Sequence, residues 1–181
     1  MIKSIYIIGS LRNPKIPEIA NAIEARGIEA FCDWFQPGPE ADDFWKKYSE
    51  ARGLTYSQAL KSHGANQIFD FDKAHLDRCD AAVMVAPAGK SGHLELGYTI
   101  GKGKPGYILF DGEPERWDVM VKFATGVFFS LDELFVELTA PGDWIDKEPR
   151  ADGRPRRWKP FEPLPATDFQ LVKQEKQNGK S

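Results

Sequence analysis

The stretch over residues 81–107, AAVMVAPAGKSGHLELGYTIGKGKPGY, constrains the fold of this chain more than any other. It opens with the apolar run AAVMVA, residues 81–86, which is typical of a strand buried on both faces of a parallel sheet. A Pro-Ala-Gly-Lys loop follows, and then Ser91, a residue type that favours the N-cap position. The pattern therefore predicts a helix over about residues 92–102, ended by Gly-Lys-Pro.

Glu95 falls in the first turn of this predicted helix, just past the carboxyl end of the strand. Ligands bind at that edge of open α/β sheets, and the helix dipole there favours the ionised carboxylate that a nucleophile requires. Acidic residues are also common in first helical turns for dipole reasons alone, so position by itself does not make Glu95 catalytic. Gly97 and Gly101 lie one turn apart and predict a helix face that packs closely on the sheet.

Strand and helix patterns alternate along the rest of the chain. The predicted strands cover about residues 5–8, 28–32, 81–86, 107–110 and 127–129. The predicted helices cover about residues 14–27, 42–52, 57–80, 92–102, 117–123 and 131–138. This alternation predicts an α/β domain with a flavodoxin- or Rossmann-like, doubly wound sheet of five parallel strands in the order 2-1-3-4-5.

The C-terminal part of the chain differs in composition from the rest. We expect the α/β domain to cover residues 1–145, and residues 146–181, rich in Pro, Arg and Lys, to form an extended arm with a disordered tail. The basic cluster at residues 154–159 either touches an anionic ligand or a neighbouring subunit, or forms a solvated surface.

Composition excludes several classes of function. A net charge of −3 over 181 residues does not favour nucleic acid or an anionic membrane as a partner. Cys32 and Cys79 lie in apolar contexts without metal-ligand spacing, which predicts core thiols in a reducing compartment. The apolar run at residues 5–8 is too short for a signal peptide, and no run reaches transmembrane length. We therefore expect a soluble cytoplasmic protein with a small-molecule partner.

Gly9, Ser10, Leu11 and Arg12 form the turn between the first strand and the first helix. Small residues let a backbone approach a ligand, amides at such a turn can bind an anion, and Arg12 can pair with a phosphate through two N–H groups. The turn lacks the spacing of a dinucleotide fingerprint or a P-loop, so a plain tight turn is the competing interpretation.

In a sheet of order 2-1-3-4-5, the turn at residues 9–12 lies beside the loop that follows the third strand. That loop carries Lys90 and Ser91 and leads to Glu95, so two polar loops are expected to converge at one crevice. Trp34 is a candidate to wall a pocket for a flat base, although core packing explains such a residue equally well.

Asp70 and Asp72 precede the third strand and can face the same crevice; on their own, both also fit an exposed helix surface. Together with Glu95, Asp72 can make a pair in which one carboxylate attacks and the other donates a proton, as glycosidic cleavage requires. His93 is two residues from Glu95 and thus roughly opposite on a helix, which disfavours a Glu–His dyad. Metal-ligand spacing is absent from the sequence, so we expect no metal or other cofactor.

Three motifs resemble the nucleoside 2-deoxyribosyltransferase superfamily, which includes the 2'-deoxynucleoside 5'-phosphate N-hydrolases. The first strand carries Tyr6 and runs into Gly-Ser-Leu-Arg, similar to the Gly-Ser-Ile-Arg turn of the hydrolases. Asp72 begins the segment Asp-x-x-x-Leu-x-x-x-Asp-Ala, which looks like the one before the family's third strand. Ser-Gly-His-Leu-Glu-Leu-Gly-Tyr, residues 91–98, followed by Gly-Lys-Pro, is similar to the family's Gly-x-x-x-Glu-Leu-Gly-x-Ala helix and the lysine-proline step after it.

The resemblance, which covers about the first 110 residues, implies a role for each matched residue. Glu95 would be the nucleophile that attacks C1' of the sugar and holds it covalently, with Tyr6 orienting it. Asp72 would contact the base and protonate it as it leaves. The resemblance also implies that the 5' end of the sugar, or its phosphate, is held by Ser10, Arg12, Ser91 and Gly92.

The sequence leaves the acceptor and the exact substrate open. The long aromatic insert over residues 33–67 and the cation Lys90 depart from the transferases, and a cation there suits a phosphate better than a free nucleoside. The acceptor of the sugar is therefore another base or water. The rival functions are a nucleotide-binding sensor without turnover and an NAD glycohydrolase of the TIR type. We also expect a homo-oligomer, a dimer or larger.

Overall fold

The computed structural model describes residues 2–139 of the 181-residue chain. The predicted domain boundary at residue 145, the arm and tail predicted over residues 146–181, and the basic cluster at 154–159 all lie outside the described residues. Among the described residues, no helix combines the length and the apolar character needed to cross a membrane.

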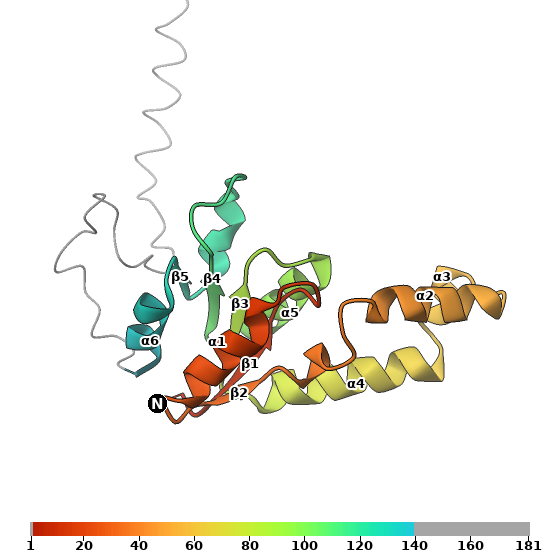
Figure 1. The fold of residues 1–181 in the computed structure, drawn as a ribbon, viewed down its shortest axis with the longest axis horizontal. Coiled ribbons are helices and arrows are strands. Elements are labelled where there is room, and N and C mark those ends of the chain that lie inside the picture. The colour runs from red at the N-terminus through yellow and green to blue at the C-terminus, as the bar shows by residue number, and fades with distance from the viewer. Residues whose placement is uncertain (1, 140–181) are drawn as a thin grey trace, which may run out of the picture.

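Five parallel strands form one sheet in the order β2-β1-β3-β4-β5 (Figure 1), which confirms the predicted topology. The strands are β1 (Ser4–Ile8), β2 (Glu29–Phe31), β3 (Ala81–Val85), β4 (Gly106–Leu109) and β5 (Gly126–Phe128). After β2 the chain returns across β1 to β3 and then continues outwards to β4 and β5. The carboxyl ends of β1 and β3, adjacent through the pair Ile8 and Met84, are therefore the switch point of the sheet.

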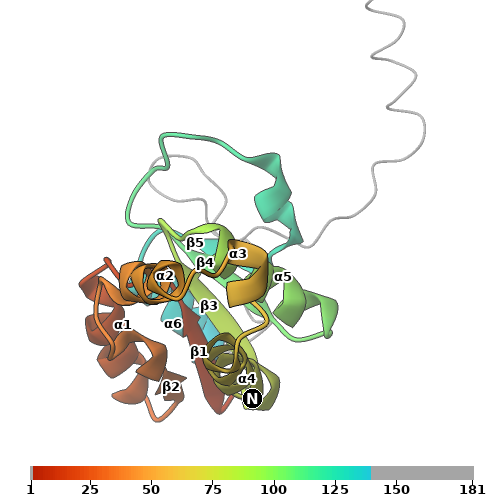
Figure 2. The ribbon, with the colours of Figure 1, turned by 90° about the vertical axis from the view of Figure 1, so that its right-hand side faces the viewer.

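Helices cover both faces of the sheet (Figure 2), so it is doubly wound as predicted. α1 (Lys15–Glu24) and α6 (Leu131–Thr139) pack on one face, and α4 (His63–Arg78) and α5 (Lys90–Gly101) pack on the other. Each face has its own apolar cluster, because strands of a parallel sheet bury side chains on both sides.

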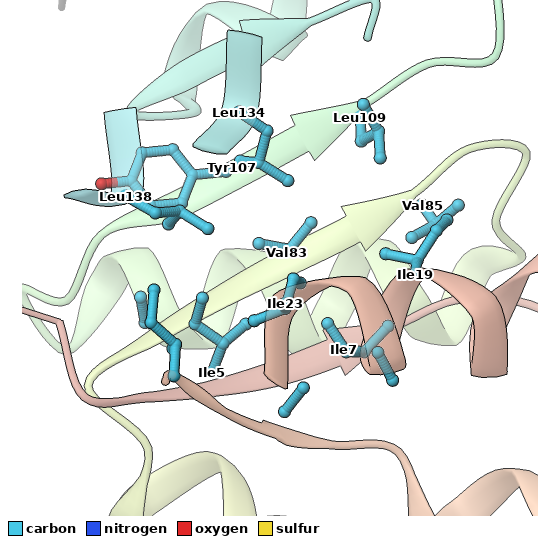
Figure 3. Packing of buried hydrophobic residues seen from close by; sticks show 14 of the residues in the cluster. Ile5, Ile7, Ile19, Ile23, Val83, Val85, Tyr107, Leu109, Leu134 and Leu138 are labelled. Carbon is cyan, nitrogen blue, oxygen red and sulfur yellow. The ribbon is translucent and has the colours of Figure 1, made fainter. Parts of the chain in front are cut away.

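The alternation of side chains along β1 decides what each face receives. Ile5 and Ile7 point to the first face, where Figure 3 shows them beside Ile23 of α1. Tyr6 and Ile8 point to the opposite face, towards α4 and α5. β1 thus delivers the Tyr6 side chain to the face that carries the two helices of the predicted catalytic carboxylates.

A helical arm extends away from the sheet (Figure 1) and is defined here as residues 41–70. It follows the short 3-10 helix η1 (Asp33–Phe35) and contains α2 (Ala41–Ala51), α3 (Tyr56–Ala59) and the first half of α4. Large apolar side chains are exposed along it, namely Phe44, Tyr48, Tyr56, Leu60, Ile68 and Phe69. Most of the aromatic insert noted in the sequence is therefore a projecting element, whereas Trp34 and Phe35 at its start pack against the core.

The single helix predicted over residues 57–80 is two helices. The chain breaks after α3, and Ser62 takes the N-cap position of α4, where its hydroxyl accepts a hydrogen bond from the Ala65 amide at 3.3 Å. Gly64, expected to weaken the helix, lies within the first turn of α4. A side-chain acceptor at Ser62 is what starts the second helix. The helix predicted over residues 117–123 is the shorter 3-10 helix η2 (Val119–Phe123).

The start of α5 also differs from the prediction. The helix begins at Lys90 with Gly89 as its N-cap, in extended backbone, so the prediction that Ser91 caps the helix is wrong. The first turn of α5 contains no acidic residue, and Glu95 lies in the second turn.

The face of α5 that packs on the sheet was also predicted wrongly. A Cβ atom added at Gly97 or Gly101 would have no neighbour within 4 Å, and both glycines are exposed. The buried residues of α5 are Gly92, Leu96 and Thr99, whose spacing of four and three residues marks the true inner face.

Candidate active site

Three side chains that are distant in sequence converge between the sheet and helices α4 and α5. Tyr6 comes from β1, Asp72 from α4 and Glu95 from α5. The Tyr6 side chain, 2% exposed, interacts with both carboxylates, and its hydroxyl lies within hydrogen-bonding range of Asp72. Burial, followed by the charges of Glu95 and Asp72, raises the pKa of Tyr6 far above its ordinary value, so the hydroxyl keeps its proton and acts as a donor.

Glu95 has the electrostatic character of a buried acid. Burial, reinforced by the negative charge of Asp72, raises the pKa of Glu95 from 4.5 to about 7. The prediction that the helix dipole keeps this carboxylate ionised is wrong, because the dipole effect falls off beyond the first turn and burial dominates in the second. Near pH 7 both the protonated and the ionised forms of Glu95 are therefore populated.

Asp72 is also shifted towards its protonated form. Burial raises the pKa of Asp72, and the hydrogen bond with Tyr6 opposes part of this rise. Two carboxylates in one site disfavour each other's ionisation, so a state with one proton on the pair is favoured. Asp70, the other acidic residue considered in the sequence, is exposed on α4.

A second group of contacts joins α4 to α5. The Tyr98 hydroxyl donates a hydrogen bond to Asp77 at 2.7 Å, and the ammonium groups of Lys73 and Lys102 lie 2.5 and 3.7 Å from the same carboxylate. Hydrogen bonds from Lys73 and then Tyr98 lower the pKa of Asp77 to about 2, so this carboxylate stays ionised at neutral pH. Asp77 thus ties together the two helices that carry the candidate catalytic carboxylates.

The carboxyl end of α4 is held by Lys104. Its ammonium group donates hydrogen bonds to the carbonyl oxygens of Leu76 at 3.2 Å and Cys79 at 2.7 Å, and also to that of Asp77. A cation here satisfies carbonyl groups that a helix end leaves without partners. The lysine of the Gly-Lys-Pro motif therefore has a structural task, which is to fix the end of the helix that carries Asp72.

An aromatic wall, which the sequence reasoning missed, stands beside Asp72. The His75 ring stacks on Phe31 of β2 with 3.7 Å between ring centroids, and Phe31 packs against Tyr6 at 5.3 Å. Phe71 completes the wall, 4.7 Å from His75 between centroids. The spacing of Phe71 and His75, one helical turn apart on either side of Asp72, is the signal that could have revealed it.

Packing and a local hydrogen bond explain much of the conformation of the turn at residues 9–12. A Cβ atom at Gly9 would lie 2.4 Å from Cδ1 of Ile16, so glycine here lets α1 pack against the end of β1. The Ser10 hydroxyl accepts a hydrogen bond from the Arg12 amide at 3.2 Å, which holds the turn. Leu11 is half-buried and Arg12 is exposed. The predicted ligand contacts of this turn stay predictions.

A cavity of about 780 Å³ lies at the carboxyl edge of the sheet. Ser10 and Arg12 line it from the β1–α1 turn, and residues 86–89 line it from the loop after β3. The turn after β1 and residues 86–89 therefore meet at one crevice, but Lys90 and Ser91, which were expected to share it, are not among its lining residues. The three catalytic candidates lie outside this lining, on the α4 and α5 side of the sheet.

The remaining predicted binding residues have different surroundings. Lys90 and Ser91 are exposed at the start of α5. Gly92 is buried, and a Cβ atom there would lie 2.9 Å from a β1 side chain, so this glycine lets α5 approach the sheet closely. The Trp34 indole donates a hydrogen bond to the carbonyl oxygen of Ile7 at 2.7 Å and packs against the core clusters of both faces. Core packing thus accounts for much of the Trp34 ring.

Within residues 2–139, no group of three or more His, Cys, Asp and Glu side chains is arranged to hold a metal ion. Both cysteines are free thiols; Cys79 is buried and Cys32 is partly buried, as their apolar contexts predict.

Comparison with known proteins establishes the fold. No protein-family model matches the chain, and no curated protein matches its sequence. A solved structure of a 2-deoxyribosyltransferase from Bacillus psychrosaccharolyticus matches 88% of this chain and 99% of that enzyme, with a TM-score of 0.51 and 14% sequence identity. At this identity the likeness concerns the fold, and it is the fold that the resemblance in the sequence implies.

Proposed function

We propose that this protein cleaves the N-glycosidic bond of a 2'-deoxynucleoside or its 5'-monophosphate through a covalent intermediate on Glu95. The observation that carries the proposal is the convergence of Tyr6, Asp72 and Glu95 in a site where burial raises the pKa of both carboxyl groups. Groups with such shifts gather at sites of acid–base and nucleophilic chemistry. The fold shared with a 2-deoxyribosyltransferase and the motifs in the sequence support the same assignment.

In the first step, an ionised Glu95 oxygen attacks C1' of the sugar. The C1'–N bond breaks, its electron pair goes to the base nitrogen, and the proton of Asp72 neutralises the leaving base. The pair shares one proton, and the reactive form is the one in which Asp72 carries that proton while Glu95 is ionised. The protonated Tyr6 hydroxyl acts as a hydrogen-bond donor that orients the carboxylates.

In the second step, an acceptor attacks C1' and releases Glu95 as a carboxylate. If the acceptor is water, Asp72 takes up its proton and the product is the free sugar or sugar phosphate. If the acceptor is another base, the same geometry transfers the sugar. Lys90 at the start of α5 and Arg12 in the β1–α1 turn are exposed cations that can contact an anionic 5' end of the substrate.

The experiment that tests the proposal is the release of free base from a panel of deoxynucleosides, deoxynucleotides and NAD. We expect wild type to release base from at least one deoxyribosyl substrate and Glu95→Gln to lose at least about 10³-fold in kcat. Glu24→Gln, an exposed glutamate on α1, is the matched control and should keep full activity. Binding without release would favour the sensor, and cleavage of NAD alone would favour the glycohydrolase.

Association of copies into a homo-oligomer and a cytoplasmic location stay predictions. Exposed apolar side chains along the arm, together with Trp117 and Phe123 at η2, support association, because large apolar patches usually mark contact surfaces. Analytical ultracentrifugation at micromolar concentration tests it, and a purely monomeric protein would contradict it.

A further inference from the structure

We infer that Asp43, on the arm, is a specificity-determining residue that selects between a neutral 5' end and a 5'-phosphate by occupying Arg12. This inference rests on the proposed function and concerns the choice of substrate, not the bond that is cleaved. Its basis is one contact: Nη2 of Arg12 lies 3.0 Å from Oδ2 of Asp43.

The contact joins two parts of the molecule with different tasks. Arg12 belongs to the turn after β1 and lines the cavity at the switch point. Asp43 lies in the first turn of α2, 31 residues further along the chain, in the element that projects from the sheet. The arm thus supplies a carboxylate to a cation that the sheet presents at the crevice.

Arg12 is the group in the β1–α1 turn that suits a phosphate best, because its planar guanidinium can offer two parallel N–H groups. The Asp43 carboxylate already accepts from one of these nitrogens. A phosphate must therefore displace Asp43 or share the guanidinium with it. Sharing places a dianion near a carboxylate of the same charge, which is unfavourable.

The other charged residues that line the cavity also disfavour an anionic ligand. Its other lining cation, Lys15, has a carboxylate partner as well: Nζ lies 2.5 Å from Oδ2 of Asp111. The charged residues of the lining are Arg12, Lys15, Glu18 and Asp111, which sum to zero. At this edge of the sheet an anionic group has to compete with a carboxylate for either cation, whereas a neutral group leaves both pairs in place.

The side chains of Arg12 and Asp43 are half-exposed, at 57% and 52% of their accessible surface, so this ion pair is weak enough to open when a ligand binds. Removing the Asp43 carboxylate should nevertheless favour a 5'-phosphate measurably. Asp43 would then no longer compete with the phosphate for Arg12 and would no longer repel it. We expect Asp43→Asn to raise the kcat/KM ratio of a 5'-monophosphate over its nucleoside by about three- to tenfold at low salt. Added salt should reduce this gain, because the groups are open to solvent.

Four variants test the inference, with the ratio measured on one base as nucleoside and as 5'-monophosphate. Asp42→Asn is the control for Asp43→Asn, because it removes the same charge from the neighbouring residue. Asp42 is exposed and is not the carboxylate that contacts Arg12, so this variant should alter the ratio less than about twofold. Asp43→Asn should raise the ratio, Arg12→Ala should lower it, and Asp43→Asn should add nothing in the Arg12→Ala background. An unchanged ratio in Asp43→Asn, or an equal loss on both substrates, would overturn the inference.

A second readout separates this inference from the proposed function. Inorganic phosphate should stabilise Asp43→Asn against thermal unfolding at lower concentrations than wild type, and this measurement needs no turnover. If no variant releases base but the phosphate effect appears, the proposed function fails and the role of Asp43 stands. If base is released but phosphate stabilises both proteins equally, the role of Asp43 fails alone.

Discussion

Replacing Glu95 by Gln should stabilise the folded protein at alkaline pH while removing its activity. The reason is that Glu95 has a pKa of about 7 in the folded state, above its ordinary value of 4.5, chiefly because it is buried. Between these two pH values the unfolded chain releases this proton while the folded chain keeps it. Stability from the protonated Glu95 is therefore fully present below about pH 4.5 and is lost as the pH rises through about 7.

The structure sets the size of this effect. The interval between 4.5 and about 7 corresponds to at most about 3.5 kcal/mol of unfolding free energy, at about 1.4 kcal/mol per pH unit. Glu95 keeps some contact with solvent, and part of the loss has already occurred at pH 5. We therefore expect wild type to lose about 2 kcal/mol relative to Glu95→Gln between pH 5 and pH 8.

Urea unfolding of the two proteins at pH 5 and pH 8 measures this difference. The comparison cancels the titrating groups that do not interact with Glu95. Glu24→Gln, whose glutamate is exposed on α1, serves as the control and should show the same pH dependence as wild type. A difference between Glu95→Gln and wild type that is the same at both pH values would refute the claim that Glu95 is a buried acid.

Three further predictions concern catalysis. The kcat/KM of wild type should fall as the pH rises above about 7, because the pair of carboxyl groups then loses the proton that the leaving base needs; an unchanged kcat/KM from pH 7 to 9 would contradict the proton-donor role. Asp72→Asn should slow substrates with poor leaving bases by about 10²- to 10⁴-fold and good ones much less, and equal slowing would assign Asp72 to positioning. Tyr98→Phe, which breaks the hydrogen bond to Asp77, should lower kcat about two- to tenfold with little change in KM, and normal kcat would show that the contact between α4 and α5 does not position the site.

The sheet was predictable from the sequence because it follows from strand patterning, whereas the grouping of Tyr6, Asp72 and Glu95 was expected from motifs that resemble a known family. Apolar runs separated by helical patterns leave few topologies, and the order 2-1-3-4-5 makes β1 and β3 neighbours. Alternation along β1 then decides which face receives Tyr6. The motifs around Asp72 and Glu95 place both carboxylates on helices that cover the same face.

The electrostatic state of Glu95 was not predictable, because it depends on where α5 begins. Ser91 and Gly89 are both acceptable N-caps, and the sequence pattern chose the wrong one. The two-residue shift moves Glu95 from the first turn into the second, where the dipole no longer offsets burial. The inner face is a separate matter: the helix buries Gly92 and Leu96, and the glycine pair at 97 and 101 faces away from the sheet.

The contact between Arg12 and Asp43 lies beyond sequence reasoning for a different reason. No local pattern relates a turn residue to a carboxylate 31 positions away on another element. This separation also has a functional meaning. The carboxyl groups of the proposed chemistry lie between the sheet and two helices tied together at Asp77, whereas the residue proposed to choose the substrate lies on a half-exposed arm. Changes on the arm can therefore alter which substrate is accepted without altering the pKa values that the reaction needs, because sites that share no partners act independently.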